Sequence, residues 1–260
     1  MTKPEIKVLP DPAAVAAETA ERVVRAADEA IALAGRFSFV LAGGSTPKAL
    51  YELLAGDSFR DRIDWPHVEI YFGDERTVPP DHKDSNYGMA RVTMLSKLPI
   101  PESNVHRMCG EIDPEEAAKE YGLLLKEKFG DGGPDLILLG MGDDGHTASL
   151  FPGTSALREM KHRAFANPVP QLNTTRLTMT APFINRAREV MVTVIGANKA
   201  SRLAEVLEGP RDPERLPVQL IQPINKSQYD ALQHWTRQHE RHFQRNGEQA
   251  TDHRVHVRPR

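Results

Sequence analysis

The chain has 260 residues, 40% of them hydrophobic and 27% charged, and a formal net charge of −3 at pH 7. This composition predicts a globular protein and gives no general reason to expect a nucleic-acid partner. No apolar run is long enough to cross a membrane, the start of the chain lacks the apolar core of a secretory signal, and the single cysteine, Cys109, favours a reducing cytoplasm.

The first residues predict an edge strand, a helix and a second strand. Residues 6–9 are the candidate edge strand, and Asp11-Pro12 then begins a helix with proline at its first position. Apolar residues recur at helical spacing from there until Gly35 ends the helix. Residues 37–42 (FSFVLA) form the next strand, which is short and apolar enough to be buried.

A glycine-rich turn, Gly43-Gly44-Ser45-Thr46-Pro47, follows that strand and leads into a helix. We expect Thr46 to cap this helix and Pro47 to be its first residue. Two glycines allow the backbone to approach a ligand closely, and free N–H groups at a helix N-terminus attract phosphate. The turn alone is equally consistent with a phosphate site and with an ordinary capped helix.

A third strand, residues 68–72 (VEIYF), runs directly into the polar residues GDER, which include Asp74 and Arg76. A polar loop and a helix at about residues 87–97 come next. Charged loops are usually only solvated. Because polar side chains at the carboxyl end of a strand can meet a ligand there, we interpret Asp74 and Arg76 as candidate site residues.

The stretch PDLILLGMGDDGHTASLFPG carries the strongest chemical signal in the chain. Residues 136–139 are a buried strand, and Asp143, Asp144 and His146 lie in the glycine-rich turn after it. We expect residues 147–150 to form a short helix that His146 opens. Ligands bind at the carboxyl ends of the strands in open α/β sheets, so these polar residues favour a site over a turn with solvated acids.

Gly140, Gly142 and Gly145 in the same stretch match the G-x-G-x-x-G fingerprint of dinucleotide-binding sites. We reject that interpretation because the carboxylates of Asp143 and Asp144 would face the pyrophosphate, and like charges repel at close range. The pattern also lies in mid-chain, and no strand ending in an acidic residue follows at the expected distance.

The remaining elements continue the alternation of strands and helices. A helix is expected at 113–129, strands at 177–180 and 190–195, and a last strand at 218–221. Lys199 lies in the first turn of a further helix, where its positive charge opposes the helix dipole. An anion beside Lys199 would explain this placement.

This alternation predicts a single-domain three-layer α/β/α fold with a mostly parallel, Rossmann-like sheet and helices on both faces. The domain is expected to span residues 1–225. Residues 226–260 are polar and basic, and we expect them to form a divergent, flexible tail that is dispensable beyond about residue 240. His239 and His242 lie three residues apart in this tail, but its composition disfavours a metal site.

The class of reaction can be narrowed by the catalytic motifs that the sequence lacks and by the candidate residues that it contains. It has no G-x-S-x-G nucleophile elbow and no H-E-x-x-H zinc pattern. A histidine base, carboxylates and separate anion-binding groups suit attack by water on an activated carbonyl, or proton transfer beside one. Either Asp143 or Asp144 could orient the ring of His146, which a helix N-terminus would help to keep neutral. The residues alone predict acid–base chemistry on a small phosphorylated metabolite.

Five motifs stand in order along the chain: LAGGSTPKALYELL, YFGDERTVPPDHKDSNYGMAR, PDLILLGMGDDGHTASLFPGT, RLTMTAPFINRAREV and IGANKA. Together they resemble the glucosamine-6-phosphate isomerase/6-phosphogluconolactonase family, from near the N-terminus to Pro223. GDER with the segment after it, and GHTASLFPG, are similar to lactonase members, whereas deaminase members have DEY-type and FNEP-type segments. After Asn225 the chain departs from the family, through a shifted reading frame or a genuine extension, which puts the family's final helix in doubt.

The resemblance implies hydrolysis of 6-phospho-D-glucono-1,5-lactone to 6-phosphogluconate in the oxidative branch of the pentose phosphate pathway, without metal or cofactor. It implies His146 as the general base on water, with Asp144 and Asp74 as supporting carboxylates. The alternatives are an enzyme of the glucosamine-6-phosphate isomerase/deaminase type and a non-catalytic sugar-phosphate binder. A small-molecule sugar phosphate is the expected partner, and a monomer or weak homo-oligomer the expected state. The residues that would hold the phosphate and sugar are Gly43, Gly44, Ser45, Thr46, Arg76 and Lys199.

Overall fold

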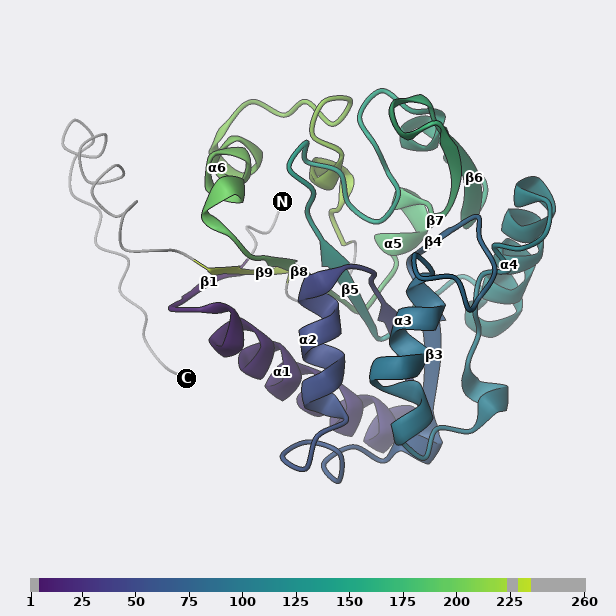
Figure 1. Cartoon of the computed structure of the whole chain (residues 1–260), viewed down its shortest axis with the longest axis vertical. Coiled ribbons are helices and arrows are strands. Elements are labelled where there is room, and N and C mark those ends of the chain that lie inside the picture. Colours follow the sequence, from purple (N-terminus) through teal and green to yellow (C-terminus); the bar gives the residue numbers. More distant parts are fainter. Residues whose placement is uncertain (1–4, 224–228, 235–260) are drawn as a thin grey trace.

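A six-stranded parallel sheet forms the centre of the fold (Figure 1). The computed structural model describes residues 5–223 and 229–234, and within them the strand order of this sheet is β1-β9-β8-β5-β2-β3. Each pairing between neighbouring strands in that order is parallel. The strands are β1 (Glu5–Leu9), β2 (Phe37–Leu41), β3 (Val68–Phe72), β5 (Leu136–Gly140), β8 (Glu189–Val194) and β9 (Tyr229–His234).

Helices cover both faces of this sheet, which confirms the predicted three-layer α/β/α architecture with a mostly parallel sheet. The helices of each face share a hydrophobic core with the strands beneath them, and α1, α2 and α3 lie side by side in Figure 1. The first face carries α1 (Pro12–Ala34), α2 (Ser45–Leu54) and α3 (Asn86–Thr93). The second carries α4 (Pro114–Phe129), α5 (Ala181–Ile184) and α6 (Ala200–Glu208).

Alternate residues of the central strands fill the two cores. In β5, Leu136 and Leu138 pack in the core under α1 and α2, whereas Ile137 and Leu139 pack in the core under α4. Successive side chains of a strand point to opposite faces, so a strand covered on both sides must be apolar throughout. This explains why β5 appears in the sequence as an uninterrupted apolar run.

A second, smaller sheet of three antiparallel strands begins beyond the carboxyl end of β3, where the chain enters its strand β4. Its order is β4-β7-β6, with β4 (Asp74–Arg76), β6 (Ala164–Val169) and β7 (Thr174–Met179). The N–H of Met179 donates to the carbonyl of Gly73 at 2.8 Å, which ties this sheet to the end of β3. Three of the four polar-segment residues GDER, Asp74 to Arg76, therefore form a strand of their own, which was not expected from the sequence.

The helix starts follow the predicted capping chemistry with one exception. Asp11 accepts the N–H of Ala14 at 2.7 Å at the start of α1, and Gly35 ends that helix with a φ of 71°. The prediction that Thr46 caps α2 is wrong, because the cap is Gly44 and Thr46 is the second helical residue. Gly44 has a φ of 101°, which glycine adopts without strain, so the helix can begin two residues earlier.

The helix predicted at residues 147–150 is wrong. Thr147 and Leu150 instead form an isolated antiparallel bridge, and Ala148 between them has a φ of 46°. The hydroxyl of Thr147 donates to the last carbonyl of β5 at 2.7 Å, so a tertiary hydrogen bond holds the segment in a tight turn. His146 therefore does not lie at a helix N-terminus, so a helix dipole does not account for a neutral ring.

The last strand predicted at residues 218–221 is also wrong. Pro217–Leu220 is a short 3-10 helix, and the N–H of Val218 donates to the carbonyl of Gly145 at 3.0 Å. The segment thus supports the glycine turn that carries His146 and does not extend the sheet. The helix expected at about 87–97 is shorter, because α3 ends at Thr93.

Strand β9, which pairs with β1 and β8, lies inside the segment that we expected to be a tail. The sheet therefore extends beyond residue 225. The division between domain and tail stays a prediction for residues 224–228 and 235–260, which lie outside the described residues. His239 and His242 lie there too.

Candidate active site

A pocket of about 700 Å³ opens at the carboxyl ends of β2, β3, β5 and β8. Its walls come from turns that are far apart in the sequence, because parallel strands place all their carboxyl ends at one edge of a sheet. Every predicted site residue lines this pocket: Gly43, Gly44, Ser45, Thr46, Asp74, Arg76, Asp144, His146 and Lys199.

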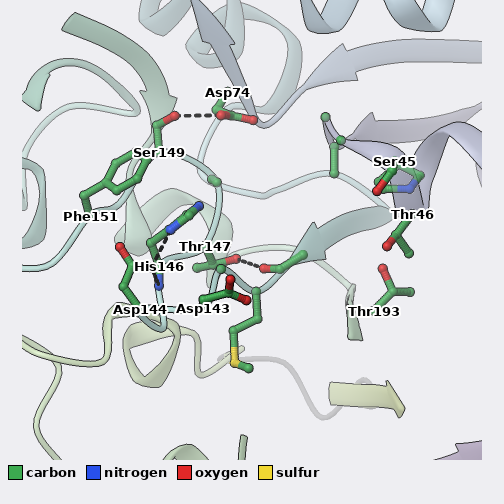
Figure 2. A pocket seen from close by; sticks show the side chains of 18 of the residues that line it. Ser45, Thr46, Asp74, Asp143, Asp144, His146, Thr147, Ser149, Phe151 and Thr193 are labelled. Carbon is green, nitrogen blue, oxygen red and sulfur yellow. Dashed lines mark hydrogen bonds and ion pairs between the residues drawn. The ribbon is translucent and has the colours of Figure 1, made fainter. Parts of the chain in front are cut away.

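His146 and Asp144 form a hydrogen-bonded pair on the wall of the pocket (Figure 2). Nδ1 of His146 lies 2.6 Å from Oδ1 of Asp144, and the same oxygen accepts the backbone N–H of His146 at 3.0 Å. The imidazole also stacks on Phe151, with the ring centroids 4.2 Å apart. Of the two acids that the sequence left open, Asp144 makes this bond, whereas Asp143 accepts from Nδ2 of Asn198 at 3.1 Å.

The pKa of Asp144 lies below its ordinary value. Burial alone would raise this pKa, but the side-chain and backbone hydrogen bonds from His146 outweigh burial and lower it. An ionised carboxylate can only accept, so a neutral His146 carries its proton on Nδ1. The lone pair is then on Nε2, at the other edge of the ring from Asp144.

Gly142 contributes space to this pair. A Cβ at Gly142 would lie 2.2 Å from both Nδ1 and Cε1 of His146 and 2.8 Å from Oδ1 of Asp144. The N–H of Gly142 also donates to the carbonyl of His146 at 2.8 Å, which closes the turn. Only a residue without a side chain allows the imidazole to occupy its position.

Asp74 lies across the pocket from Asp144 and is held by two neighbours (Figure 2). Its Oδ2 accepts the hydroxyl of Ser149 at 2.6 Å, and its Oδ1 accepts Nδ2 of Asn86 at 3.1 Å. A Cβ at Gly43 would lie 1.8 Å from Oδ1 of Asn86, so this glycine makes room for the residue that positions Asp74. The carboxylate has lone pairs left for a ligand hydroxyl.

The N-terminus of α2 faces the pocket without a side-chain cap. Ser45 and Thr46 are its first two residues, and free N–H groups at such a position attract anions. Tyr51 fixes the helix against β2, because its hydroxyl accepts the N–H of Ala42 at 2.9 Å and donates to the carbonyl of Ala42 at 2.8 Å. The glycine-rich turn is therefore held at the end of the strand.

Two predicted cations border the pocket. Nζ of Lys199 donates to the carbonyl of Met141 at 2.5 Å, which places the ammonium group beside the turn after β5. Arg76 donates through Nη1 to the carbonyl of Asp84. Each group has donors left over for an anion.

Ser149 and Arg176 are among the polar residues of the pocket that could not be identified from the sequence. Ser149 lies in the segment expected to be helical, where its contact with Asp74 could not be foreseen. Arg176 lies in the quoted motif RLTMTAPFINRAREV, which was assigned only as a strand. The signal that could have found Arg176 is the pairing of this strand with GDER, which periodicity does not reveal.

Within residues 5–223 and 229–234, no group of three or more His, Cys, Asp and Glu residues is placed to hold a metal ion. In the same part of the chain, no helix has the length and apolar character needed to cross a bilayer.

Comparisons with known proteins agree with this fold. A family model described as glucosamine-6-phosphate isomerases/6-phosphogluconolactonase matches residues 10–229. A 6-phosphogluconolactonase of a Nostoc species is 40% identical over 227 residues, 85% of this chain and 92% of the relative. A Synechocystis protein of the same name is 45% identical over 202 residues, 75% of this chain and 81% of the relative.

A crystal structure of a 6-phosphogluconolactonase from Shewanella baltica superimposes with a TM-score of 0.79 at 27% identity, covering 90% of this chain and 99% of that structure. The chain belongs to the glucosamine-6-phosphate isomerase/6-phosphogluconolactonase family.

Proposed function

We propose that this protein hydrolyses 6-phospho-D-glucono-1,5-lactone to 6-phosphogluconate, in the oxidative branch of the pentose phosphate pathway, with His146 as the general base. The names of the Nostoc and Synechocystis relatives support the reaction. The observation that carries the role of His146 is its hydrogen bond to Asp144, in a pocket that also contains anion-binding groups. With one cysteine in the chain, we expect the reaction in the reducing cytoplasm.

The proposed mechanism begins with a water molecule between Nε2 of His146 and the lactone carbonyl. Nε2 takes one proton as the water oxygen bonds to the carbonyl carbon, and the ionised Asp144 stabilises the resulting imidazolium. The bond from the carbonyl carbon to the ring oxygen then breaks. The proton on Nε2 passes to that oxygen, which leaves as a hydroxyl group, and His146 returns to its starting state.

Binding groups for the rest of the substrate surround this centre. Arg76 and Lys199 provide positive charge, and the uncapped start of α2 offers N–H groups and the hydroxyls of Ser45 and Thr46. Together they would hold the phosphate and adjacent sugar atoms. Asp74 would accept a hydrogen bond from a sugar hydroxyl and so orient the ring.

The alternative within the same family is a glucosamine-6-phosphate isomerase or deaminase. The lactonase is favoured because the named relatives are lactonases and because GDER and GHTASLFPG are similar to the lactonase members. A non-catalytic sugar-phosphate binder is disfavoured by the intact pair of His146 and Asp144, since binding alone does not need an oriented base.

A direct test supplies freshly prepared 6-phosphoglucono-1,5-lactone and couples the product to 6-phosphogluconate dehydrogenase. Glucosamine 6-phosphate is supplied in a parallel assay that measures released ammonia. The spontaneous opening of the lactone in water is subtracted. Turnover of the lactone above this background supports the proposal, whereas ammonia release or inactivity toward both compounds would refute it.

A further inference from the structure

Glu75 is a buried carboxylate that lies between two pocket residues in the sequence but does not line the pocket. It is the middle residue of β4 and is 2% exposed, whereas its neighbours Asp74 and Arg76 both line the pocket. Successive side chains of a strand point to opposite faces, so Glu75 points away from a ligand. Burial raises the pKa of Glu75, and the negative charge of Asp74 raises it further. A buried carboxylate is unfavourable unless its hydrogen bonds compensate, so its partners indicate its role.

The partners of Glu75 lie at the start of α3. Oε1 accepts the N–H of Asn86 at 2.7 Å, and Oε2 accepts the N–H of Tyr87 at 2.8 Å and the hydroxyl of Ser85 at 3.1 Å. Asn86 and Tyr87 are the first two residues of α3, whose N–H groups have no partner within the helix. Ser85 accepts the N–H of the third residue, Gly88, at 3.0 Å. Glu75 therefore completes the cap of a helix that begins eleven residues later, and so joins β4 to α3.

Asn86 extends this restraint to the pocket. Its backbone is held by Glu75, and its Nδ2 donates to the carbonyl of Asp74 at 2.9 Å and to Oδ1 of Asp74 at 3.1 Å. Asn86 is 2% exposed, and within the described part of the chain its own Oδ1 is buried without a hydrogen-bond partner. A buried unsatisfied acceptor is unfavourable. The bonds of the backbone and of Nδ2 therefore determine where this side chain lies, although Oδ1 gains nothing there.

The structure assigns Glu75 as a positioning residue for Asp74. The carboxylate of Glu75 fixes the start of α3 on β4, and Asn86 in turn fixes the carboxylate of Asp74. The inference rests on the proposed function, in which Asp74 orients the sugar ring by accepting a hydrogen bond from a hydroxyl of the substrate. Glu75 itself touches neither the substrate nor the reacting atoms.

Glu75→Gln tests the assignment with little change in side-chain size. Each oxygen of Glu75 accepts a backbone N–H, so an amide NH2 in either position would face a donor and lose that hydrogen bond. Because a misplacement of about 1 Å can cost about a hundredfold in rate, kcat/KM on the phosphorylated lactone should fall at least about tenfold. The assay is run well below the melting temperature of the variant, so that all of the protein is folded.

A double-mutant cycle separates positioning from general stability. Asp74→Asn removes the carboxylate that Glu75 positions. Adding Glu75→Gln to Asp74→Asn should therefore lower kcat/KM by less than about threefold, because the effects of residues that act through one another are not additive. If the two losses multiply, or if Glu75→Gln lowers only the melting temperature, the role of Glu75 is purely structural and the assignment is overturned.

Asn86→Ala is a second variant that decides the question if Glu75→Gln does not fold. It keeps the backbone N–H that Glu75 accepts and removes the amide that contacts Asp74. It should show the same loss in kcat/KM and the same lack of additivity with Asp74→Asn. Wild-type kcat/KM in Asn86→Ala would overturn the assignment.

Asp135→Asn is the matched control. Oδ2 of Asp135 accepts the N–H of Ser38 at 2.9 Å and its hydroxyl at 2.6 Å, so this variant alters a carboxylate that holds a backbone N–H outside the pocket. It should lower the melting temperature and leave kcat/KM unchanged.

A crystal structure of Glu75→Gln provides a readout that does not depend on the reaction. The carboxylate of Asp74 should lose its 3.1 Å contact with Nδ2 of Asn86 and leave its wild-type position. An Asp74 carboxylate that stays in place would overturn the assignment. Failure of the proposed function has a different signature, because the wild type itself would then not hydrolyse the lactone. The position of Asp74 in the variant would still decide the role of Glu75.

Discussion

Replacement of His146 by asparagine is the most direct test of the proposed chemistry. The amide nitrogen of asparagine lies about where Nδ1 of the imidazole is, so it can still donate to Asp144 at the 2.6 Å contact. The substitution removes Nε2, the nitrogen proposed to accept the proton from water. His146→Asn should therefore lower kcat and leave KM close to wild type.

The expected size follows from general-base catalysis, which typically contributes about 10²–10⁴-fold. At about 1.4 kcal/mol per tenfold change, this is roughly 3–6 kcal/mol of activation free energy. The cost to folding should be much smaller, because the side chain of His146 is 30% exposed and its ring stacks on that of Phe151 at the wall of the pocket. A melting temperature close to wild type is therefore expected.

His67→Asn is a matched control. Nδ1 of His67 lies 2.8 Å from Oδ2 of Asp64, so this variant alters a histidine–aspartate pair of the same kind outside the pocket. Its kcat should therefore not change. Stopped-flow or coupled assays with the spontaneous rate subtracted measure kcat for both variants. A His146→Asn variant within a few fold of wild-type kcat would refute the assignment, and Asp74 or Asp144 would then be the base to test.

Three further predictions concern the groups around this centre. Gly142→Ala should lower kcat at least about tenfold, because the new Cβ needs the space of the His146 ring, and unchanged kinetics would show that the ring does not need its observed position. Arg76→Ala and Lys199→Ala should each lose about ten- to a hundredfold in kcat/KM on the phosphorylated lactone and much less on the unphosphorylated one, and equal losses on both lactones would contradict their phosphate role. Because folding lowers the pKa of Asp144, its ionised carboxylate stabilises the folded protein fully at pH values above the ordinary carboxyl pKa. This stabilisation is lost as the pH falls through the lowered pKa. Asp144→Asn should accordingly lower the melting temperature near neutral pH and have little effect in strong acid, and a difference that did not vary with pH would be inconsistent with an ionised partner of His146.

The helices and central strands were predictable because their signals are local. The cap at Asp11, the proline after it and the ending glycine at Gly35 define α1 within one stretch of chain. Continuous apolar runs such as residues 136–139 identify strands that are buried on both faces. The failures at residues 147–150 and 218–221 have the opposite cause, because hydrogen bonds to distant segments decided the backbone there.

The candidate site was predictable as a set of residues but not as a geometry. A glycine turn or a pair of acidic residues directly after an apolar run indicates the carboxyl end of a strand. In a parallel sheet these ends all lie at the same edge, so the residues that follow them are expected to lie close together. The sequence does not show whether Asp143 or Asp144 binds His146, because both lie in the same turn. The backbone of the turn determines that Asp144 contacts His146 and Asp143 contacts Asn198.

By itself, the sequence determined the layered α/β fold, the strands whose ends form the pocket and the chemical types gathered there. Those properties depend on hydrophobic periodicity, capping and glycine placement, all of which act over a few residues. Only the tertiary structure decided that β4 pairs with β7, and so brought Arg176 opposite Arg76, one hundred residues earlier in the chain. Strand pairing is a long-range interaction whose register depends on packing across the whole sheet, and no local pattern encodes it.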